Sequence, residues 1–284
     1  MLLLLLLART YTYLAPIILL LLCSNAAAID DPAAQGSERA ALEDFKAAIT
    51  SHSGVLASWN GSASYCSWEG VTCGRRHRWR VVSLDLNSRG LDGIISPAIG
   101  NLTFLRSLNL SRNGLQGEIP PSVGSLRRLQ YLNLRGNSLS GTIPSNISRC
   151  ASLRELVLAD NKGIRGRIPS EIGGMPLLSI LHIANNSITG TIPPSLGNLS
   201  LLTKLSLSNN YLEGSIPASL GNNVQLGLLY LVSNNLSGLF PASLYNMSSL
   251  YDLDVAGNSL HGSLPDDLGT SLPTSQHPGY QDPI

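Results

Sequence analysis

Hydrophobic and polar residues alternate in one fixed arrangement over most of this 284-residue chain. A phrase L-x-L-x-x-N, as in Leu108–Asn113, is followed by a phrase L-x-G-x-I-P, as in Leu115–Pro120. The glycine of the second phrase returns every 24 residues, with a single step of 25. Its eight copies are Gly93, Gly117, Gly141, Gly166, Gly190, Gly214, Gly238 and Gly262. Self-similarity at a fixed period of this length is typical of a solenoid built from stacked coils.

The L-x-L phrase predicts a short strand in every coil. Alternation directs both leucines inward and the residue between them outward. Stacked coils then place these strands side by side in a parallel sheet on the concave side of the solenoid. The fold class that follows is an α/β repeat solenoid, a superhelix with a concave parallel β-sheet.

The asparagine that closes each first phrase stands where the chain turns back into the coil. A buried amide can satisfy backbone groups that a tight turn would leave unpaired. We therefore expect a structural asparagine ladder of Asn113, Asn137, Asn161, Asn186, Asn210, Asn234 and Asn258. The first coil departs from the pattern, with Arg89 in the asparagine column, as terminal repeats commonly do.

A helical segment precedes the repeats. Apolar residues at Leu42, Phe45 and Ile49 form a stripe with helical spacing. Farther along, Cys66 and Cys73 lie seven residues apart, and a local disulfide between them would suit an oxidising compartment. Two free thiols are the alternative, and a zinc site is disfavoured because the spacing is not C-x₂-C.

The N-terminus has the features of a secretory signal. Residues 14–22 form an apolar run, and the small residues 26–28 suit a cleavage site. A retained membrane anchor is the alternative, but Pro16 and the polar stretch 9–13 leave fewer than the ~20 apolar residues that a span needs. We therefore expect the secretory pathway and an extracellular location, in the apoplast or on the outer face of the plasma membrane.

Charge and motifs restrict the possible functions. The net charge of +1, with 13% charged residues, argues against nucleic-acid binding. No catalytic or phosphate-binding phrase occurs, and the histidines show no ligand spacing, so we expect no enzyme activity, no metal and no cofactor. The basic run 75–80 is interpreted as a solvated loop, with a patch for an anionic ligand as the alternative.

The repeat resembles the plant-type leucine-rich repeat, and residues 56–73 resemble the N-terminal cap of plant repeat receptors. The closest resemblance is to ectodomains of plant leucine-rich-repeat receptor kinases that sense bacterial patterns, including the cereal bacterial-blight-resistance type. It implies a signal peptide at 1–28, a cap at 29–79, eight repeats at 80–272 and a non-repeat tail at 273–284. Since the tail lacks another L-x-L phrase and a closing cysteine pair, we expect a chain truncated before a membrane span and a kinase.

The resemblance implies recognition of a peptide or protein ligand in defence or developmental signalling. A co-receptor with a similar repeat ectodomain is a second expected partner, and a membrane is expected only if the full-length form continues into a span. A secreted inhibitor of a microbial wall-degrading enzyme, like polygalacturonase-inhibiting proteins, is the alternative.

In a solenoid, ligand contacts lie at the outward strand positions, unless the binding coils lie outside this chain. The concave-face candidates are Tyr131, Arg135, Glu155, His182, Lys204, Tyr230 and Asp252, with His182 expected to be an exposed recognition residue.

Sequons for N-glycosylation are frequent in the chain, although each is a weak motif by itself. They stand at Asn60, Asn101, Asn109, Asn146, Asn185, Asn198, Asn235 and Asn246. A glycan on Asn109, the middle residue of a predicted strand, would obstruct the concave face of the second coil. Asn101, Asn198 and Asn246 share one column outside the concave strand, so glycans there would leave that face free.

Overall fold

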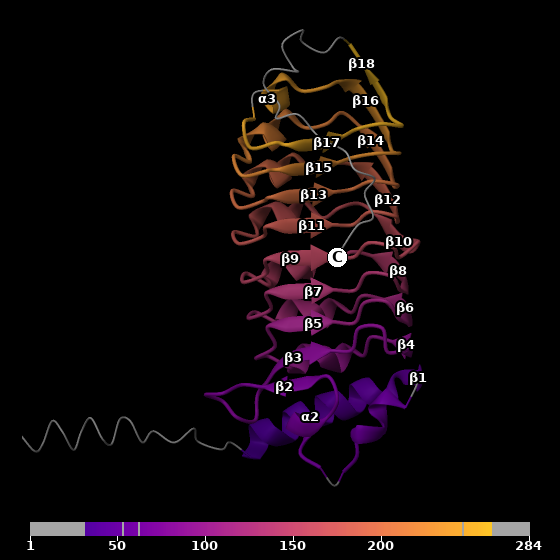
Figure 1. The fold of residues 1–284 in the computed structure, drawn as a ribbon, viewed down its shortest axis with the longest axis vertical. Coiled ribbons are helices and arrows are strands. Elements are labelled where there is room, and N and C mark those ends of the chain that lie inside the picture. The colour runs from indigo at the N-terminus through magenta and orange to yellow at the C-terminus, as the bar shows by residue number, and fades with distance from the viewer. Residues whose placement is uncertain (1–31, 53, 62, 246, 263–284) are drawn as a thin grey trace, which may run out of the picture.

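Every repeat forms one coil with a short strand on each of two sides, as the computed structural model shows (Figure 1). The structure describes residues 32–52, 54–61, 63–245 and 247–262. Within these residues the strands form two nine-stranded sheets. The predicted signal peptide at 1–28 and the predicted tail at 273–284 lie outside the described residues.

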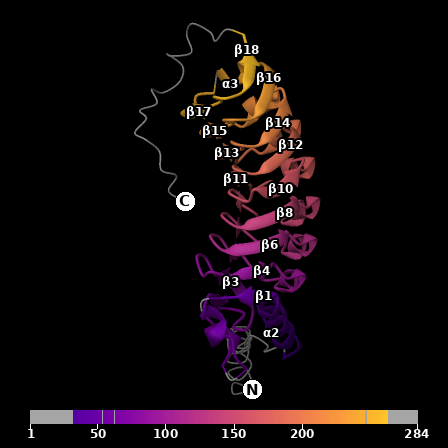
Figure 2. The same cartoon turned by 90° about the vertical axis from the view of Figure 1, so that its right-hand side faces the viewer.

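The first sheet is built from the L-x-L phrases. Equivalent leucines lie opposite one another in neighbouring coils, since Leu108 pairs in parallel register with Leu84 and Leu132. Its first pair is antiparallel and its others are parallel. The strands are β2 (Val71–Cys73), β3 (Val81–Asp85), β5 (Ser107–Asn109), β7 (Tyr131–Asn133), β9 (Glu155–Val157), β11 (Ile180–His182), β13 (Lys204–Ser206), β15 (Leu228–Tyr230) and β17 (Asp252–Asp254). Seen from the side, the stack bends, and this sheet lies on the concave side (Figure 2).

A second sheet, which the sequence did not lead us to expect, is built from the L-x-G-x-I-P phrases. The strands are β1 (Ile49–Ser51), β4 (Asp92–Ile94), β6 (Gly114–Glu118), β8 (Ser138–Thr142), β10 (Gly163–Gly166), β12 (Ser187–Thr191), β14 (Tyr211–Gly214), β16 (Asn235–Leu239) and β18 (Ser259–His261). It is parallel except at its first pair, where β1 from the cap meets β4. The glycine of this phrase lies within a strand, and Gly117 and Gly141 have the positive φ that only glycine adopts easily.

The third side of the coil carries short helices. Most are 3₁₀-helices that begin just after the Ile-Pro pair or its equivalent, and they stack on one another from coil to coil. They are η3 (Pro97–Asn101), η4 (Pro121–Ser125), η5 (Ser145–Arg149), η6 (Ser170–Gly174), η7 (Pro194–Asn198) and η8 (Ala218–Asn222), followed by the short helix α3 (Ala242–Tyr245).

The N-terminal cap closes the first coil. Helix α2 (Pro32–Ala47) is followed by two 3₁₀-helices, η1 (Val55–Ser58) and η2 (Tyr65–Ser67). Leu42 and Phe45 of α2 are buried in the core that continues into the repeats, and Trp59 stacks on Trp68 with 5.2 Å between ring centroids. A disulfide joins Cys66 to Cys73. The predicted solenoid with a helical, disulfide-linked cap is confirmed.

The asparagine side chains link each coil to the coil before it. Asn137, for example, donates to the carbonyls of Leu110 and Leu134, while its Oδ1 accepts from the backbone N–H of Leu115. Equivalent donor bonds recur at the other asparagines of the column: Asn113, Asn161, Asn186, Asn210, Asn234 and Asn258. The column therefore pairs backbone groups that the tight turn leaves without partners in either sheet.

Candidate binding face on the concave sheet

In the repeat strands from β5 to β17, the first and third residues point away from the core and the middle leucine packs into it. The register aligns these positions into two columns that cross the coils. In the last coils, the column of first residues runs through Lys204, Leu228 and Asp252. The column of third residues runs through Ser206, Tyr230 and Asp254. The repeat pattern does not specify the residue types at these outward positions, so the surface chemistry of this face can differ from coil to coil.

The concave face is hollowed over β11 to β17. A cavity of about 370 Å³ lies there, and four of our seven candidates line it together. Its lining residues are His182, Ala184, Asn185, Lys204, Ser206, Ser208, Asn209, Tyr230, Val232, Asp252 and Asp254. These come from four successive coils, so a ligand seated in the cavity would run across the strands.

Charge divides this cavity along the solenoid. The basic groups, His182 and Lys204, come from β11 and β13, whereas the acidic groups, Asp252 and Asp254, come from β17. The hydroxyl of Tyr230 donates a hydrogen bond to Oδ2 of Asp252, which orients both side chains. A ligand whose anionic group lies toward β11 and whose donors lie toward β17 would match this order of charges.

The expected exposure of His182 is wrong. Its side chain is buried, with a residue exposure of 6%, and Lys204 is similarly covered at 8%. Both line the hollow beside residues of the neighbouring coils. They are accessible only to a group that enters the cavity.

The remaining three candidates lie outside the cavity. Tyr131 is exposed on β7, and Glu155, half-buried on β9, pairs with it across the sheet. Burial raises the pKa of Glu155 above its ordinary value. Arg135 donates from Nε to Asp160 at 2.7 Å, so its guanidinium is held in an ion pair within the protein.

That ion pair begins a row of side-chain hydrogen bonds along the rim of the concave face. The other carboxylate oxygen of Asp160 accepts from Nδ2 of Asn185 at 2.6 Å, and Oδ1 of Asn185 accepts from Nδ2 of Asn209 at 2.8 Å. Asp160, Asn185 and Asn209 all have positive φ, a conformation that Asn and Asp tolerate better than most residues. The row ends in the cavity wall, since Asn185 and Asn209 line it.

Sequence reasoning missed several of the lining residues. Ser208 and Asn209 occupy the two unspecified positions before the asparagine of the L-x-L-x-x-N phrase, and we did not include them among the candidates. The phrase carries only part of the signal: the position directly before the asparagine is polar in these coils, as at Asn185, Asn209 and Ser233, whereas the position before it varies.

Sequon asparagines occupy different surfaces. Asn60, Asn101, Asn198 and Asn235 are exposed away from the concave strands, and Asn146 is half-buried in η5. Asn109 lies on β5, where its Oδ1 accepts from the backbone and hydroxyl of Ser111, and Asn185 lies on the cavity rim. The sequon at Asn246 lies outside the described residues. Glycosylation at each of these sites stays a prediction.

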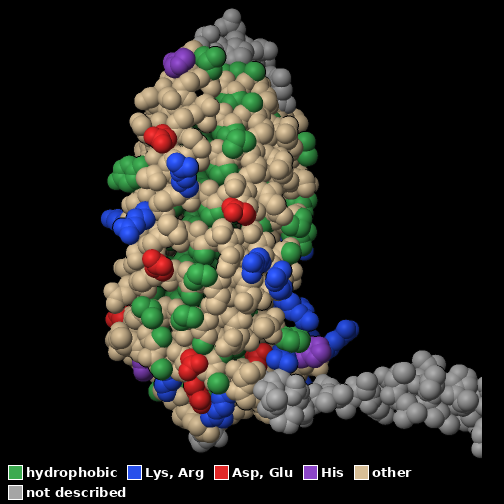
Figure 3. All heavy atoms as spheres, turned by 180° about the vertical axis from the view of Figure 1, so that it is seen from behind, with side chains coloured by type: hydrophobic (Ala, Val, Ile, Leu, Met, Phe, Trp, Pro, Cys, Tyr) green, Lys and Arg blue, Asp and Glu red, His purple; other side chains and the backbone are tan. Residues whose placement is uncertain are grey.

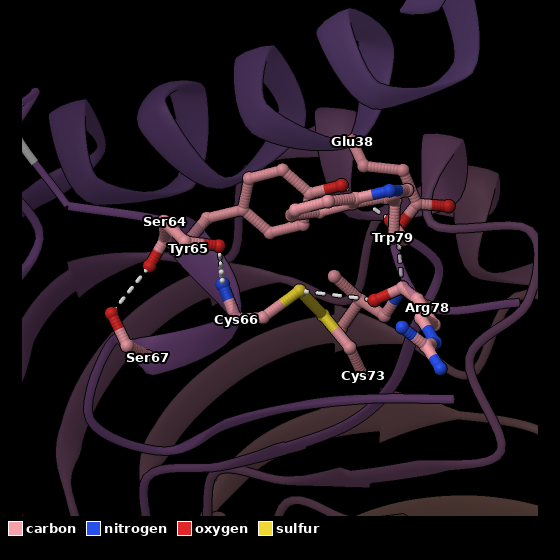
Figure 4. The surroundings of a disulfide bond; sticks show 9 residues. Glu38, Ser64, Tyr65, Cys66, Ser67, Cys73, Arg78 and Trp79 are labelled. Carbon is pink, nitrogen blue, oxygen red and sulfur yellow. Dashed lines mark hydrogen bonds between the residues drawn. A yellow bond between two sulfur atoms is a disulfide. The ribbon is translucent and has the colours of Figure 1, made fainter. Parts of the chain in front are cut away.

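The disulfide lies in a cap that contains several internal polar contacts (Figure 4). The hydroxyl of Tyr65 donates to the carbonyl of Trp79, and burial raises the pKa of this phenol to about 12. The carboxylate of Glu38 is fully buried and accepts from the backbone N–H of Val81 at 2.8 Å. Burial raises the pKa of Glu38, against the opposing effects of that N–H and of Arg80. The contacts of Glu38 join α2 to β3, and we interpret this cluster as structural.

Other classes of site find little support in the described part of the chain. There, no group of three His, Cys, Asp or Glu side chains is arranged to hold a metal ion. Over the same residues, no helix has the length and apolar character that crossing a bilayer requires. Cys150 is buried and its thiol donates to the carbonyl of Val123, and burial raises the pKa of this thiol to about 11.

Comparison with family models assigns the architecture. Residues 35–74 match the leucine-rich-repeat N-terminal domain, and residues 105–162, 177–199 and 201–223 match leucine-rich-repeat models. The chain is a leucine-rich-repeat protein. The matched segments coincide with the disulfide-linked cap and with the coils that form the concave sheet.

Among curated relatives, the chain is similar to plant receptor kinases. It is 56% identical over 68 residues to the receptor-like kinase EFR of Arabidopsis thaliana, which is 23% of this chain and 6% of that protein. It is 53% identical over 72 residues to the receptor kinase-like protein Xa21 of Oryza sativa subsp. japonica, covering 23% of this chain and 7% of that protein. The chain thus spans a small part of these relatives, and their kinase domains are not covered.

Solved ectodomains have the same fold over a longer stretch. The ectodomain of GASSHO1/SCHENGEN3 from Arabidopsis thaliana, in complex with CASPARIAN STRIP INTEGRITY FACTOR 2, superposes with a TM-score of 0.70 at 33% identity, over 83% of this chain and 31% of that one. The Arabidopsis HAESA ectodomain, in complex with an IDA peptide hormone, gives 0.67 at 31% identity, over 84% and 44%. A HAESA complex with IDA and the co-receptor SERK1 gives 0.51 at 30%, over 79% and 46%.

Proposed function

We propose that this chain is an extracellular recognition module that binds an extended peptide or protein segment in the concave cavity over β11 to β17. The observation that carries the proposal is the cavity itself, in which His182, Lys204, Tyr230 and Asp252 from four coils converge. A peptide laid across the strands would meet basic groups first and acidic groups last.

Two structural relatives support a peptide as the ligand class. The GASSHO1/SCHENGEN3 and HAESA ectodomains were each solved with a bound factor or peptide hormone, and both superpose on most of this chain. The HAESA complex that includes SERK1 supports a second partner, a co-receptor with a similar repeat ectodomain.

The wider context follows from the curated relatives. Since EFR and Xa21 are receptor kinases, we infer that this module belongs to a receptor whose membrane span and kinase lie beyond the present chain, and that it acts in defence or developmental signalling at the cell exterior. The chain itself contributes recognition.

The test fills the cavity without changing charge. Ser206 is only 4% exposed and lines the cavity, whereas Ser237 is exposed on β16 of the other sheet. Peptides selected from a random dodecapeptide phage library on the parent chain are assayed against Ser206→Trp and Ser237→Trp. We expect Ser206→Trp to weaken binding by about tenfold or more and Ser237→Trp to leave it unchanged. Equal affinities for both variants, or selection of no peptide at all, would reject the concave cavity as the site.

A further inference from the structure

A second cavity, of about 630 Å³, lies beside the first coils, between the loop that follows β2 and the segments that precede β5 and β7. Four arginines and a histidine line it around one aromatic ring. They are Arg75, Arg76, His77, Phe104, Arg106 and Arg128. Seen from behind, Lys and Arg side chains gather along this edge of the molecule near the cap (Figure 3).

No acidic residue balances these charges. The cavity lining contains no Asp or Glu. Among the residues that the structure describes, the ion pairs of arginine involve Arg39, Arg80, Arg89 and Arg135, and none involves an arginine of the lining. Arg75, Arg76, Arg106 and Arg128 are all exposed, so they are accessible to a ligand from solvent.

The side chain of Phe104 holds part of the cluster in place. The guanidinium carbon of Arg128 lies 4.0 Å from its ring centroid, and that of Arg80 lies 4.6 Å from it. The ring of His77 meets the same phenylalanine edge-on at 5.1 Å. Cation–π contacts of this kind offset part of the repulsion between the two arginines, which lie well within the Debye length of about 10 Å at 0.1 M salt. Arg80 also forms an ion pair with Glu38, whereas no carboxylate of the described residues pairs with Arg128.

Clustered cations around a hollow favour an anion with several charges. Guanidinium groups bind planar carboxylates through paired hydrogen bonds. We propose that this basic cavity binds a carboxylate-rich segment of an acidic peptide. A peptide is favoured as the occupant because the cavity adjoins the concave sheet: Val82 of β3 lines it, and Arg106 immediately precedes β5. This choice of occupant rests on the proposed function of the concave face.

The experiment uses a defined probe. Fluorescein-labelled hexaglutamate is titrated with the full chain and followed by anisotropy, with hexaglutamine as the uncharged comparison. The cavity variant is Arg106→Gln/Arg128→Gln. The matched control is Arg165→Gln/Arg167→Gln, which removes the same charge from two exposed arginines in and just after β10 on the other sheet. Thermal unfolding of both variants verifies that each is folded.

We expect saturable binding of hexaglutamate, no binding of hexaglutamine, and an affinity lower by about tenfold or more in the cavity variant. The control should stay within about twofold of the parent, because its arginines lie on another surface. An equal loss in both variants would mean that only net charge matters, and absence of binding to the parent would also overturn the proposal.

Two further arms separate the alternatives. If a galacturonic-acid oligomer bound through the same arginines while hexaglutamate did not, the occupant would be an acidic polysaccharide and the peptide proposal would be wrong. Ser206→Trp should bind hexaglutamate as the parent does, because the two cavities share no lining residue. Failure of the concave site and failure of the basic site are therefore observed independently.

Discussion

Replacing Asn161 with leucine tests whether the asparagine column holds the coils together. The side chain is fully buried and makes four hydrogen bonds. Its Nδ2 donates to the carbonyls of Leu134, Leu158 and Ala159 at 2.9 to 3.1 Å, and its Oδ1 accepts from the N–H of Leu139 at 3.1 Å. Leucine has a similar size and can make none of these bonds.

The size of the effect follows from which partners remain. The carbonyl of Leu134 keeps a bond from Asn137, that of Leu158 keeps one from Asn186, and that of Ala159 keeps one from the backbone of Gly136. The N–H of Leu139 loses its side-chain acceptor inside the core. One unsatisfied buried group costs about 1–3 kcal/mol, and we expect a loss of this size rather than several times as much.

Chemical denaturation followed by far-UV circular dichroism measures the loss. The control is Asn222→Leu, an exposed asparagine in η8, which should change the unfolding free energy by less than about 0.5 kcal/mol. Asn258→Leu should cost less than Asn161→Leu, because Asn258 is only half-buried in the last described coil. Equal stabilities of Asn161→Leu and the parent would refute the structural role of the column.

Three further measurements examine the cap and the core. Reduction of the Cys66–Cys73 bond should lower stability by about 2–3 kcal/mol through loop entropy, and an unchanged melting temperature in dithiothreitol would show that the bond does not stabilise the cap. Because burial raises the pKa of Glu38, the stability that its protonated form contributes is complete below its ordinary pKa and is lost as pH rises through the folded value. Glu38→Gln, whose amide oxygen can still accept from Val81, should therefore show a flatter stability profile as the pH rises above the ordinary glutamate pKa of about 4, and parallel profiles would refute this. Cys150, buried and with its pKa raised to about 11, should resist a thiol reagent at neutral pH until the chain unfolds, and rapid labelling of the native protein would contradict its burial.

Periodicity predicted the first sheet because L-x-L alternation and its 24-residue repeat are both visible in the sequence. The second sheet was missed for a physical reason. Its strands are centred on glycine and precede proline, residues with weak strand preference. They form because stacking places equivalent segments of successive coils in hydrogen-bonding register, as where Gly117 pairs with Leu139. The stabilising hydrogen bonds come from the neighbouring coil, so the sequence of a single repeat does not indicate a strand there.

Alternation also predicted which side chains face the concave surface, but not how deeply they lie. Lys204 and His182 point outward from their strands and are nevertheless buried. Their coverage depends on which residues the adjacent coils place beside them. That cannot be deduced from the period of a single repeat. The same applies to the basic cavity, since the fold brings Arg75 of the cap together with Arg128 of a repeat.

The bend of the stack is set on the side of the 3₁₀-helices, away from the concave sheet. Hydrogen bonds fix the spacing of the concave strands at about 4.8 Å, so the bend depends on how closely the 3₁₀-helices approach one another. In η4 and η6, Gly124 and Gly173 are buried, and a Cβ atom at either would lie within 3 Å of the next coil, at Asn146 or at Ser195. A side chain there would separate the helices while the strands kept their spacing, and the bend would tighten. Gly124 and Gly173 therefore permit the close approach of the 3₁₀-helices on which the bend of the concave sheet depends.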